Sequence, residues 1–209
     1  MNRARNKCQT IIVILILFIG NCSLAQQDST KIFFTSSVGL LVPASAFAKS
    51  YQQSLALNSG IEYGLKRNFF LQFVLDFNAV KYSQQIKDKN SNYLFQNTNS
   101  SVLLAGFNFG KNIAIVSSKK CSFSPYLGIG YANIGEPRLT VDVTKGIISQ
   151  TVTRMQGIYS KAGTRILYNT NSKLLQTLYL DSSYWLSNVR VQESTAQAWS
   201  FLIGTRIGF

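Results

Sequence analysis

The stretch Ala198–Phe209, A-W-S-F-L-I-G-T-R-I-G-F, decides the fold that we predict for this chain. Every second residue belongs to a mostly apolar set: Trp199, Phe201, Ile203, Thr205, Ile207 and Phe209. The residues between them are small or polar. Since successive strand side chains point to opposite faces, the stretch predicts a strand with one apolar face. An apolar face that ends on an aromatic residue suits a strand that closes a barrel in a membrane, where it meets lipid and the interfacial aromatic girdle.

The composition agrees with alternating strands. The chain has 209 residues, of which 46% are hydrophobic and 14% charged, against roughly 25% charged in typical soluble domains. After the first 25 residues, no apolar run reaches the ~18 residues that a membrane helix needs. Moderate hydropathy without such a run favours strands over helices.

The N-terminal segment has the pattern of a secretory signal peptide, which we assign to residues 1–25. Its positive region contains three basic residues: Arg3, Arg5 and Lys7. The apolar region Ile11–Gly20 is too short to span a bilayer, and Ser23-Leu24-Ala25 is a small-x-small cleavage site. Residues 26–31 then form a short polar lead.

The cysteines leave alternatives for this segment. Cys22 allows lipidation at that residue in place of removal, although Asn21 before it is a poor residue for such processing, and a retained anchor is a further alternative.

If cleavage follows Ala25, Cys121 remains alone, so the mature chain has no disulfide framework. A small structural residue near a turn is the simpler interpretation of Cys121, and a reactive thiol is the other.

The rest of the chain divides into eight strand candidates and their connections. The predicted strands are 32–42, 54–65, 69–82, about 100–116 with a bulge at Gly110, 122–134, 157–168, 174–186 and 198–209. The predicted long loops are 43–53, 83–98, 135–156 and 187–197; within the third, T-V-D-V-T and I-I-S-Q-T-V-T suggest a projecting hairpin. Tight turns lie at the other end. We place Tyr82, Trp185 and Trp199 in a loop-side aromatic girdle, and Tyr63, Phe69 and Phe209 in a turn-side one.

These features predict an all-β fold, an eight-stranded antiparallel up-and-down transmembrane β-barrel over residues 32–209. A spanning strand needs roughly 9–11 residues at its tilt. Short turns on one side and long loops on the other are typical of outer-membrane barrels, so we expect both termini on the periplasmic side and the long loops outside the cell. Closure removes the unpaired edges that an open sheet would present to lipid.

The signal peptide, the alternating segments, the stretch P-Y-L-G-I-G-Y at Pro125–Tyr131 and the final F-L-I-G-T-R-I-G-F together resemble the small outer-membrane β-barrel family of Gram-negative bacteria (OmpA/OmpX-like). The resemblance implies insertion by a barrel-assembly machinery that recognises the last strand. The residues of this assembly signal are Phe201, Ile203, Thr205, Ile207 and Phe209. The resemblance implies a location and an architecture, but no molecular role, because this architecture hosts many roles.

The composition excludes several kinds of chemistry. The chain has no histidine, which removes Ser–His–Asp and Cys–His catalysis and most zinc sites. We therefore expect no enzymatic activity, no cofactor and no metal. Without residues 1–25, the chain has 18 Lys and Arg residues and 8 Asp and Glu residues, which gives a formal charge of +10. In an exported protein without a nucleic-acid-binding motif, this surplus indicates anionic lipid or polysaccharide and no nucleic acid.

The barrel interior is predicted to hold an ionic network. The inward-facing charges are Glu62, Asp76, Lys161, Arg165, Asp181 and Arg206. Because eight strands leave just enough room for side chains, and buried charges must be paired, we favour a plug over a narrow channel. Glu62 and Arg206 are the expected ion pair. The inward glycines make room either for bulky neighbours or for water.

The loop side is predicted to carry cations that face lipopolysaccharide phosphates, with solvated loop charge as the alternative. These residues are Lys81, Lys87, Lys89, Arg138, Arg154 and Arg190. The sequence thus favours a monomeric outer-membrane barrel with a structural or surface-interaction role, whose partners are outer-membrane lipid, lipopolysaccharide and the assembly machinery. The alternatives are a narrow pore or transport barrel for small hydrophobic ligands, and a soluble or lipid-anchored lipocalin-like periplasmic binding barrel.

Overall fold

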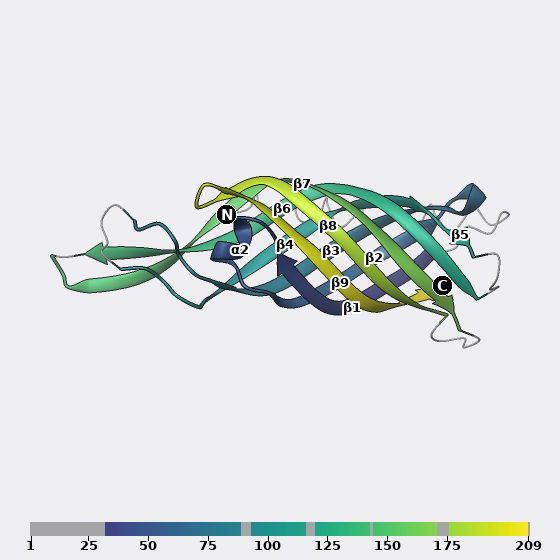
Figure 1. Cartoon of the computed structure of the whole chain (residues 1–209), viewed down its shortest axis with the longest axis horizontal. Helices are drawn as coiled ribbons and strands as arrows, with labels where there is room; N and C mark the ends of the chain where they lie inside the picture. Colours follow the sequence, from purple (N-terminus) through teal and green to yellow (C-terminus); the bar gives the residue numbers. More distant parts are fainter. Residues whose placement is uncertain (1–31, 89–92, 116–119, 143, 171–175, 209) are drawn as a thin grey trace, which may run out of the picture. The chain divides into compact units, whose positions relative to one another are not determined.

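The computed structural model describes residues 32–88, 93–115, 120–142, 144–170 and 176–208 (Figure 1). The predicted signal peptide (1–25), the polar lead (26–31), Lys89 and Phe209 lie outside these residues. No helix in the described ranges is long and apolar enough to cross a membrane.

Within the described residues, eight long antiparallel strands close into a barrel. The strands are β1 Ile32–Pro43, β2 Ser54–Gly64, β3 Phe69–Tyr82, β4 Thr98–Lys111, β6 Cys121–Asp142, β7 Ile147–Asn169, β8 Thr177–Val191 and β9 Ser194–Gly208, with a short β5 at Ile113–Ala114. The first and last strands, β1 and β9, pair with each other, and β4 pairs with β6. Every long strand therefore has two neighbours, which confirms the predicted up-and-down barrel.

The alternation of the strands sorts side chains between an outer apolar wall and the interior. In β3, Leu71, Phe73, Leu75 and Phe77 are exposed, whereas every second residue from Phe70 to Tyr82 is buried. In β9, Trp199, Phe201 and Ile203 are exposed in the same way. The faces predicted for these strands are confirmed.

The predicted bulge at Gly110 is wrong. Gly110 pairs with Tyr126, and Ile113 pairs with Phe123 in the same register, so no extra residue lies between them. The chain is interrupted at Asn112 instead. There the backbone N–H of Asn112 donates to the carbonyl of Asn68, which ties this end of β4 to the β2–β3 turn.

The third predicted loop is mostly strand. The paired register of β6 and β7 extends from Cys121–Tyr168 to Asp142–Ile147, whereas β4 stops pairing with β6 at Ile134. The two strands thus continue as a hairpin past their neighbours (Figure 1), as expected from the two Thr-rich segments. Pro137 is tolerated there because this part of β6 is an edge that needs no donor.

The fourth predicted loop, 187–197, is also wrong. β8 and β9 run almost to their turn, and only Gln192 and Glu193 connect them, both with positive φ. Positive φ at both central residues is the conformation of the tight turns that fit the twist of a hairpin. A register shift between Leu186 and Arg190 accommodates the extra residues. The polar side chains of this segment, which suggested a loop, belong to strands.

The structure corrects two of the predicted girdle residues. Tyr82 and Trp185 are fully buried in the interior, as the alternation of β3 and β8 itself requires. Trp199 does face outward, and its ring lies 4.9 Å from that of Tyr184. Tyr63 is exposed and Phe69 half-buried on the outer wall, in agreement with the prediction.

The first predicted loop enters the barrel mouth. Its short helix α2, Phe47–Ser50, places Phe47 with no exposed surface. The backbone N–H of Ala44 donates to the carbonyl of Gln197 on β9, which fixes the start of this segment. The segment therefore fills space inside the strands, which places it among the residues that decide whether the barrel is open.

Candidate functional site: the barrel interior and its loop-side rim

The turn-side half of the interior is organised around Glu62 on β2. Its Oε2 lies 2.8 Å from Nη1 of Arg165 on β7, and its Oε1 lies 2.8 Å from Nη1 of Arg206 on β9. The expected pair of Glu62 and Arg206 is thus present, and Arg165 joins it. The side chains of Glu62 and Arg165 are buried and that of Arg206 is half-buried, so the single carboxylate compensates two guanidinium groups in the interior.

Aromatic rings complete the surroundings of these guanidinium groups. The guanidinium carbon of Arg165 lies 4.4 Å from the ring centroid of Phe70, with the rings of Tyr126 and Tyr179 at 5.6 and 5.8 Å. Arg206 lies 4.2 Å over the ring of Phe33. Ring faces attract cations most strongly where water is excluded, so they supplement the one carboxylate.

A second ion pair lies nearer the middle of the barrel. Nζ of Lys161 is 2.6 Å from Oδ2 of Asp76, and the amide of Asn58 donates to the other carboxylate oxygen. The third inward carboxylate, Asp181, accepts from the hydroxyl of Tyr126 at 2.9 and 3.0 Å. The six predicted residues therefore all lie inside, three cations against three carboxylates.

Neutral side chains connect these charges across the strands. The amide of Asn108 donates to Gln72 Oε1 at 3.0 Å, and the amide of Gln72 donates to Thr35 Oγ1 at 2.9 Å. This chain links β4, β3 and β1 at the level of the Glu62 ion pairs, because Gln72 pairs with Glu62 and Thr35 pairs with Arg206. Because a buried polar group without a partner is costly, these hydrogen bonds stabilise the polar interior, although Asn108 Oδ1 and Nε and Nη2 of Arg165 are buried without a hydrogen-bond partner.

At two of the inward glycines, Gly163 and Gly130, a tyrosine ring lies in the space that a larger side chain would occupy. A Cβ on Gly163 would lie 2.5 Å from Cζ of Tyr126, and one on Gly130 would lie 2.7 Å from Cε1 of Tyr159. These tyrosines occupy the space that a larger residue would take. Of the two interpretations of the glycines, the structure shows bulky neighbours here.

The loop-side half of the interior is apolar, which the sequence interpretation missed. Phe47 of α2 lies at its centre, with ring centroids 4.5 Å from Tyr51 and 6.2 Å from Trp185. The buried cluster around it contains, among others, Leu41, Val80, Val102, Leu104, Ile134, Val189 and Val191. Consecutive apolar pairs such as Leu40-Leu41 and Leu103-Leu104 were the available signal, since one member of each must face inward.

A polar cluster of Tyr82, Asp88, Glu136 and Arg138 lies at the loop side of this apolar layer; we call it the latch. Glu136 on β6 is fully buried; its Oε1 is 2.8 Å from Nη2 of Arg138 and accepts from Tyr82 at 3.2 Å. Arg138 also binds Asp88 of the segment 83–97, at 2.7 Å. Burial lowers the pKa of the Arg138 guanidinium, but the carboxylates of Glu136 and Asp88 outweigh this effect and raise it. Unlike Lys81, Lys87, Arg154 and Arg190, the other predicted loop-side cations that the structure describes, Arg138 is thus bound to two carboxylates.

The segment 83–97 is fastened to the other loop-side elements by backbone contacts. Ser83 donates its N–H to the carbonyl of Ser50 beside α2. The backbone N–H groups of Gln85 and Ile86 donate to Gln192 Oε1 in the β8–β9 turn, at 2.6 and 3.0 Å. The described part of this segment therefore connects the first loop, the last turn and the latch.

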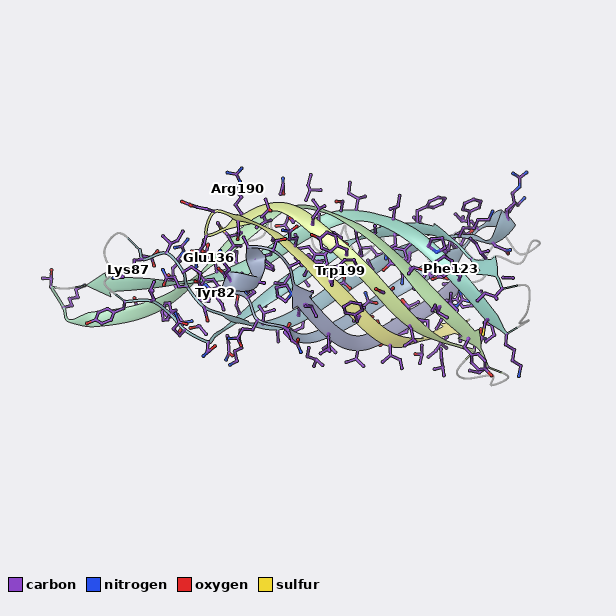
Figure 2. All side chains as sticks on the ribbon, in the orientation of Figure 1. Tyr82, Lys87, Phe123, Glu136, Arg190 and Trp199 are labelled. Carbon is purple, nitrogen blue, oxygen red and sulfur yellow. The ribbon has the colours of Figure 1, made fainter. Side chains whose placement is uncertain are left out.

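The other predicted cations that the structure describes are exposed, on the outer wall or beyond its loop-side end. Lys87 and Arg190 are exposed at the loop side, far along the strands from Phe123 (Figure 2). Lys81 and Arg154 are exposed on β3 and β7, and each donates to a residue of β4: Lys81 to Asn99 at 2.6 Å and Arg154 to Ser101 at 2.9 Å. Among the predicted cations that the structure describes, these two thus have partners on the same strand.

The four described residues of the predicted assembly signal lie on the outer face of β9. Phe201 and Ile203 are exposed, and Thr205 and Ile207 are half-buried. The strand that carries them pairs on both sides, with β1 and β8. Elsewhere, no group of three or more His, Cys, Asp or Glu residues among the described side chains is arranged to hold a metal ion.

Comparisons with known proteins concern the fold. No protein-family model and no curated protein sequence matches the chain. Among solved structures, a major outer membrane protein from Thermus thermophilus is similar with a TM-score of 0.54 and 10% identity, over 85% of this chain and 99% of that one. The attachment invasion locus protein Ail of Yersinia pestis has 0.48 and 10%, over 87% and 100%; the N-terminal β-barrel domain of Pseudomonas aeruginosa OprF has 0.47 and 12%, over 87% and 100%.

The closed sheet, the exposed apolar wall and the filled interior define the class of fold. The chain has an all-β, eight-stranded antiparallel barrel fold, similar to that of the Thermus thermophilus outer membrane protein, and this is the fold that the OmpA/OmpX-like resemblance implied. At about 10% identity the likeness extends to the fold alone, and the role must be argued from the interior and the rim.

Proposed function

We propose that this protein is a monomeric, integral outer-membrane barrel with a closed lumen and a structural or surface-interaction role. The observation that carries the proposal is the double filling of the interior. The Glu62 and Asp76 ion pairs occupy the turn-side half, and the cluster around Phe47 occupies the loop-side half. Two layers of different chemistry would both have to open before an ion could pass.

The exposed apolar wall supports insertion in a membrane. Its outward side chains include Leu57, Ile61, Phe73, Phe107, Leu127, Ile129, Leu180 and Ile203. Monomeric soluble proteins rarely expose contiguous apolar surface of more than a few hundred Å². Together with the predicted signal peptide, this surface supports a location in the outer membrane of a Gram-negative cell. The long β6–β7 hairpin and the segment 83–97 would then face outward, and both termini the periplasm.

The proposal assigns no catalytic role to the interior. A sequence without histidine leaves carboxylates, lysines, hydroxyl groups and cysteine thiols as acid–base candidates. The inward carboxylates Glu62 and Asp76 are held by cations. Insertion would depend on an assembly machinery that recognises the last strand, as the family resemblance implies.

Conductance measurements test the closed lumen. Purified protein is inserted into planar bilayers, and single-channel current is compared between the wild type and the double variant F47A/E62A, which removes side-chain volume from both layers. The proposal expects no stepwise current from the wild type and discrete current steps from the variant. Regular channels in the wild type would instead support the narrow-pore alternative. Protein that stays soluble without detergent would contradict membrane insertion altogether.

A further inference from the structure

The outer wall carries a compact polar surface where β3, β4, β6 and β7 leave the apolar wall. We call it the rim patch, and it consists of Lys81, Asn99, Ser101, Asn133, Arg154 and Gln156. Strand registry makes these residues neighbours: Lys81 pairs with Asn99, and Asn133 pairs with Gln156. Since Asn99 and Ser101 are two residues apart on β4, they share its outer face.

The two cations of the rim patch are held in place by neutral partners. Lys81 donates to Asn99 Oδ1 at 2.6 Å, and Nη1 of Arg154 donates to Ser101 Oγ at 2.9 Å. Gly135 pairs with Arg154 on β7, and a Cβ there would lie in ordinary contact with Nη1 of Arg154, at 3.5 Å. Both positive groups are thus anchored to one strand, with remaining N–H donors available.

Carboxylates are kept away from this surface. Four of the described carboxylate side chains lie in the interior: Glu62, Asp76, Glu136 and Asp181. Asp88 forms an ion pair with Arg138, and Glu193 lies in the β8–β9 turn. Neither Lys81 nor Arg154 takes part in the ion pairs that the described side chains form with one another. The rim patch therefore combines two cations with amide and hydroxyl donors and has no acid of its own.

The apolar wall begins directly below the rim patch. On the same strands, Phe77, Leu103, Tyr131 and Ile158 are exposed. A ligand that fits both surfaces has an anionic group next to hydrocarbon. Charge-assisted hydrogen bonds from Arg and Lys are the usual means of holding phosphate.

We propose that the rim patch is a binding site for lipid-borne phosphate, in which Lys81 and Arg154 hold the phosphate group while the acyl chains lie on the wall below. The proposal rests on the proposed membrane insertion and names the lipid chemistry that the barrel selects. It also separates Lys81 and Arg154 from Lys87, Arg138 and Arg190, which have no such surroundings.

Lipid binding to the folded, detergent-purified full-length protein tests this site by native mass spectrometry. The probes are bis-phosphorylated lipid A, the same lipid after phosphatase treatment, and phosphatidylglycerol. The variant K81Q/R154Q is compared with K87Q/R190Q, which loses the same charge elsewhere on the loop side. We expect K81Q/R154Q to weaken binding of the phosphorylated lipid about tenfold, equal to about 1.4 kcal/mol, and K87Q/R190Q to leave it within about twofold.

The probes identify the source of the phosphate. Stronger binding of lipid A than of phosphatidylglycerol assigns the site to the glycolipid, and equal binding assigns it to phospholipid headgroups in general; both support the site. Undiminished binding of the dephosphorylated lipid, or equal loss in both variants, would overturn it. A boiling-dependent gel shift of each sample reports the barrel itself, so loss of that shift in the wild type would count against membrane insertion and not against the rim patch.

Discussion

Substitution of Glu62 by Gln removes a carboxylate that forms ion pairs with two guanidinium groups of the interior, the buried one of Arg165 and the half-buried one of Arg206. The side chains of Glu62 and Arg165 are each 1% exposed, and that of Arg206 is 13% exposed. Removing one partner of a buried pair costs about 3–5 kcal/mol, because the remaining charge stays buried without compensation. The amide oxygen of Gln still accepts one hydrogen bond, so we expect the lower end, about 3 kcal/mol.

Urea unfolding from phospholipid vesicles, followed by tryptophan fluorescence, measures this loss in the free energy of unfolding. The matched control is E193Q, the same chemical change in the exposed β8–β9 turn, where we expect at most about 0.5 kcal/mol. The double variant E62Q/R206Q should lose less than the two single variants combined, since it also removes one of the uncompensated cations. If E62Q unfolds within about 0.5 kcal/mol of the wild type, the ion pairs do not organise the interior and the reasoning fails.

Three further predictions concern the filling of the barrel. Phe47→Ala leaves a void in the loop-side layer, so we expect a loss of about 3–5 kcal/mol in the same unfolding assay; an unchanged midpoint would show that α2 is not packed inside. Gly163→Val forces its side chain onto the ring of Tyr126 and should destabilise by at least about 1–3 kcal/mol, whereas free accommodation would indicate an open lumen. In single-tryptophan variants, brominated lipid should quench Trp199 strongly and Trp185 weakly, because only Trp199 faces outward; equal quenching would contradict the assigned faces.

Period-2 alternation was sufficient to predict the barrel and its inner charges. Lys161 and Arg165 on β7, and Glu62 on β2, each fall on the parity opposite an apolar stripe, and the structure places all of them inside. Alternation also determines which face Tyr82 and Trp185 occupy. They were misplaced because their aromatic character and their position near strand ends were weighed above parity.

The predicted ends of β8 and β9 were too short. Their outward-facing residues become polar where the lipid-facing wall ends, but the hydrogen-bonded pairing of the two strands continues beyond that point. Beyond that point outward residues such as Asn188 and Arg190 are polar, although Val189 and Val191 still face the interior. The same effect concealed the β6–β7 hairpin beyond Ile134. Polar composition therefore marked the boundary of the wall and not the end of the strands.

Contacts between segments distant in sequence were beyond prediction. Nothing local in α2 indicates that Phe47 meets Trp185, and the latch joins Asp88 to Arg138 across 50 positions. Likewise, only the closed register brings Arg154 to Ser101. Such contacts depend on which strands become neighbours when the sheet closes.

The central claim, a closed barrel that spans the outer membrane, is tested most directly by gel mobility of the outer-membrane fraction with and without boiling. A folded membrane barrel resists SDS until it is heated, because its backbone hydrogen bonds are all satisfied within a closed sheet. We predict that the protein is found in this fraction and that its mobility changes on boiling. A protein recovered from the soluble periplasm, with the same mobility before and after boiling, would contradict the claim.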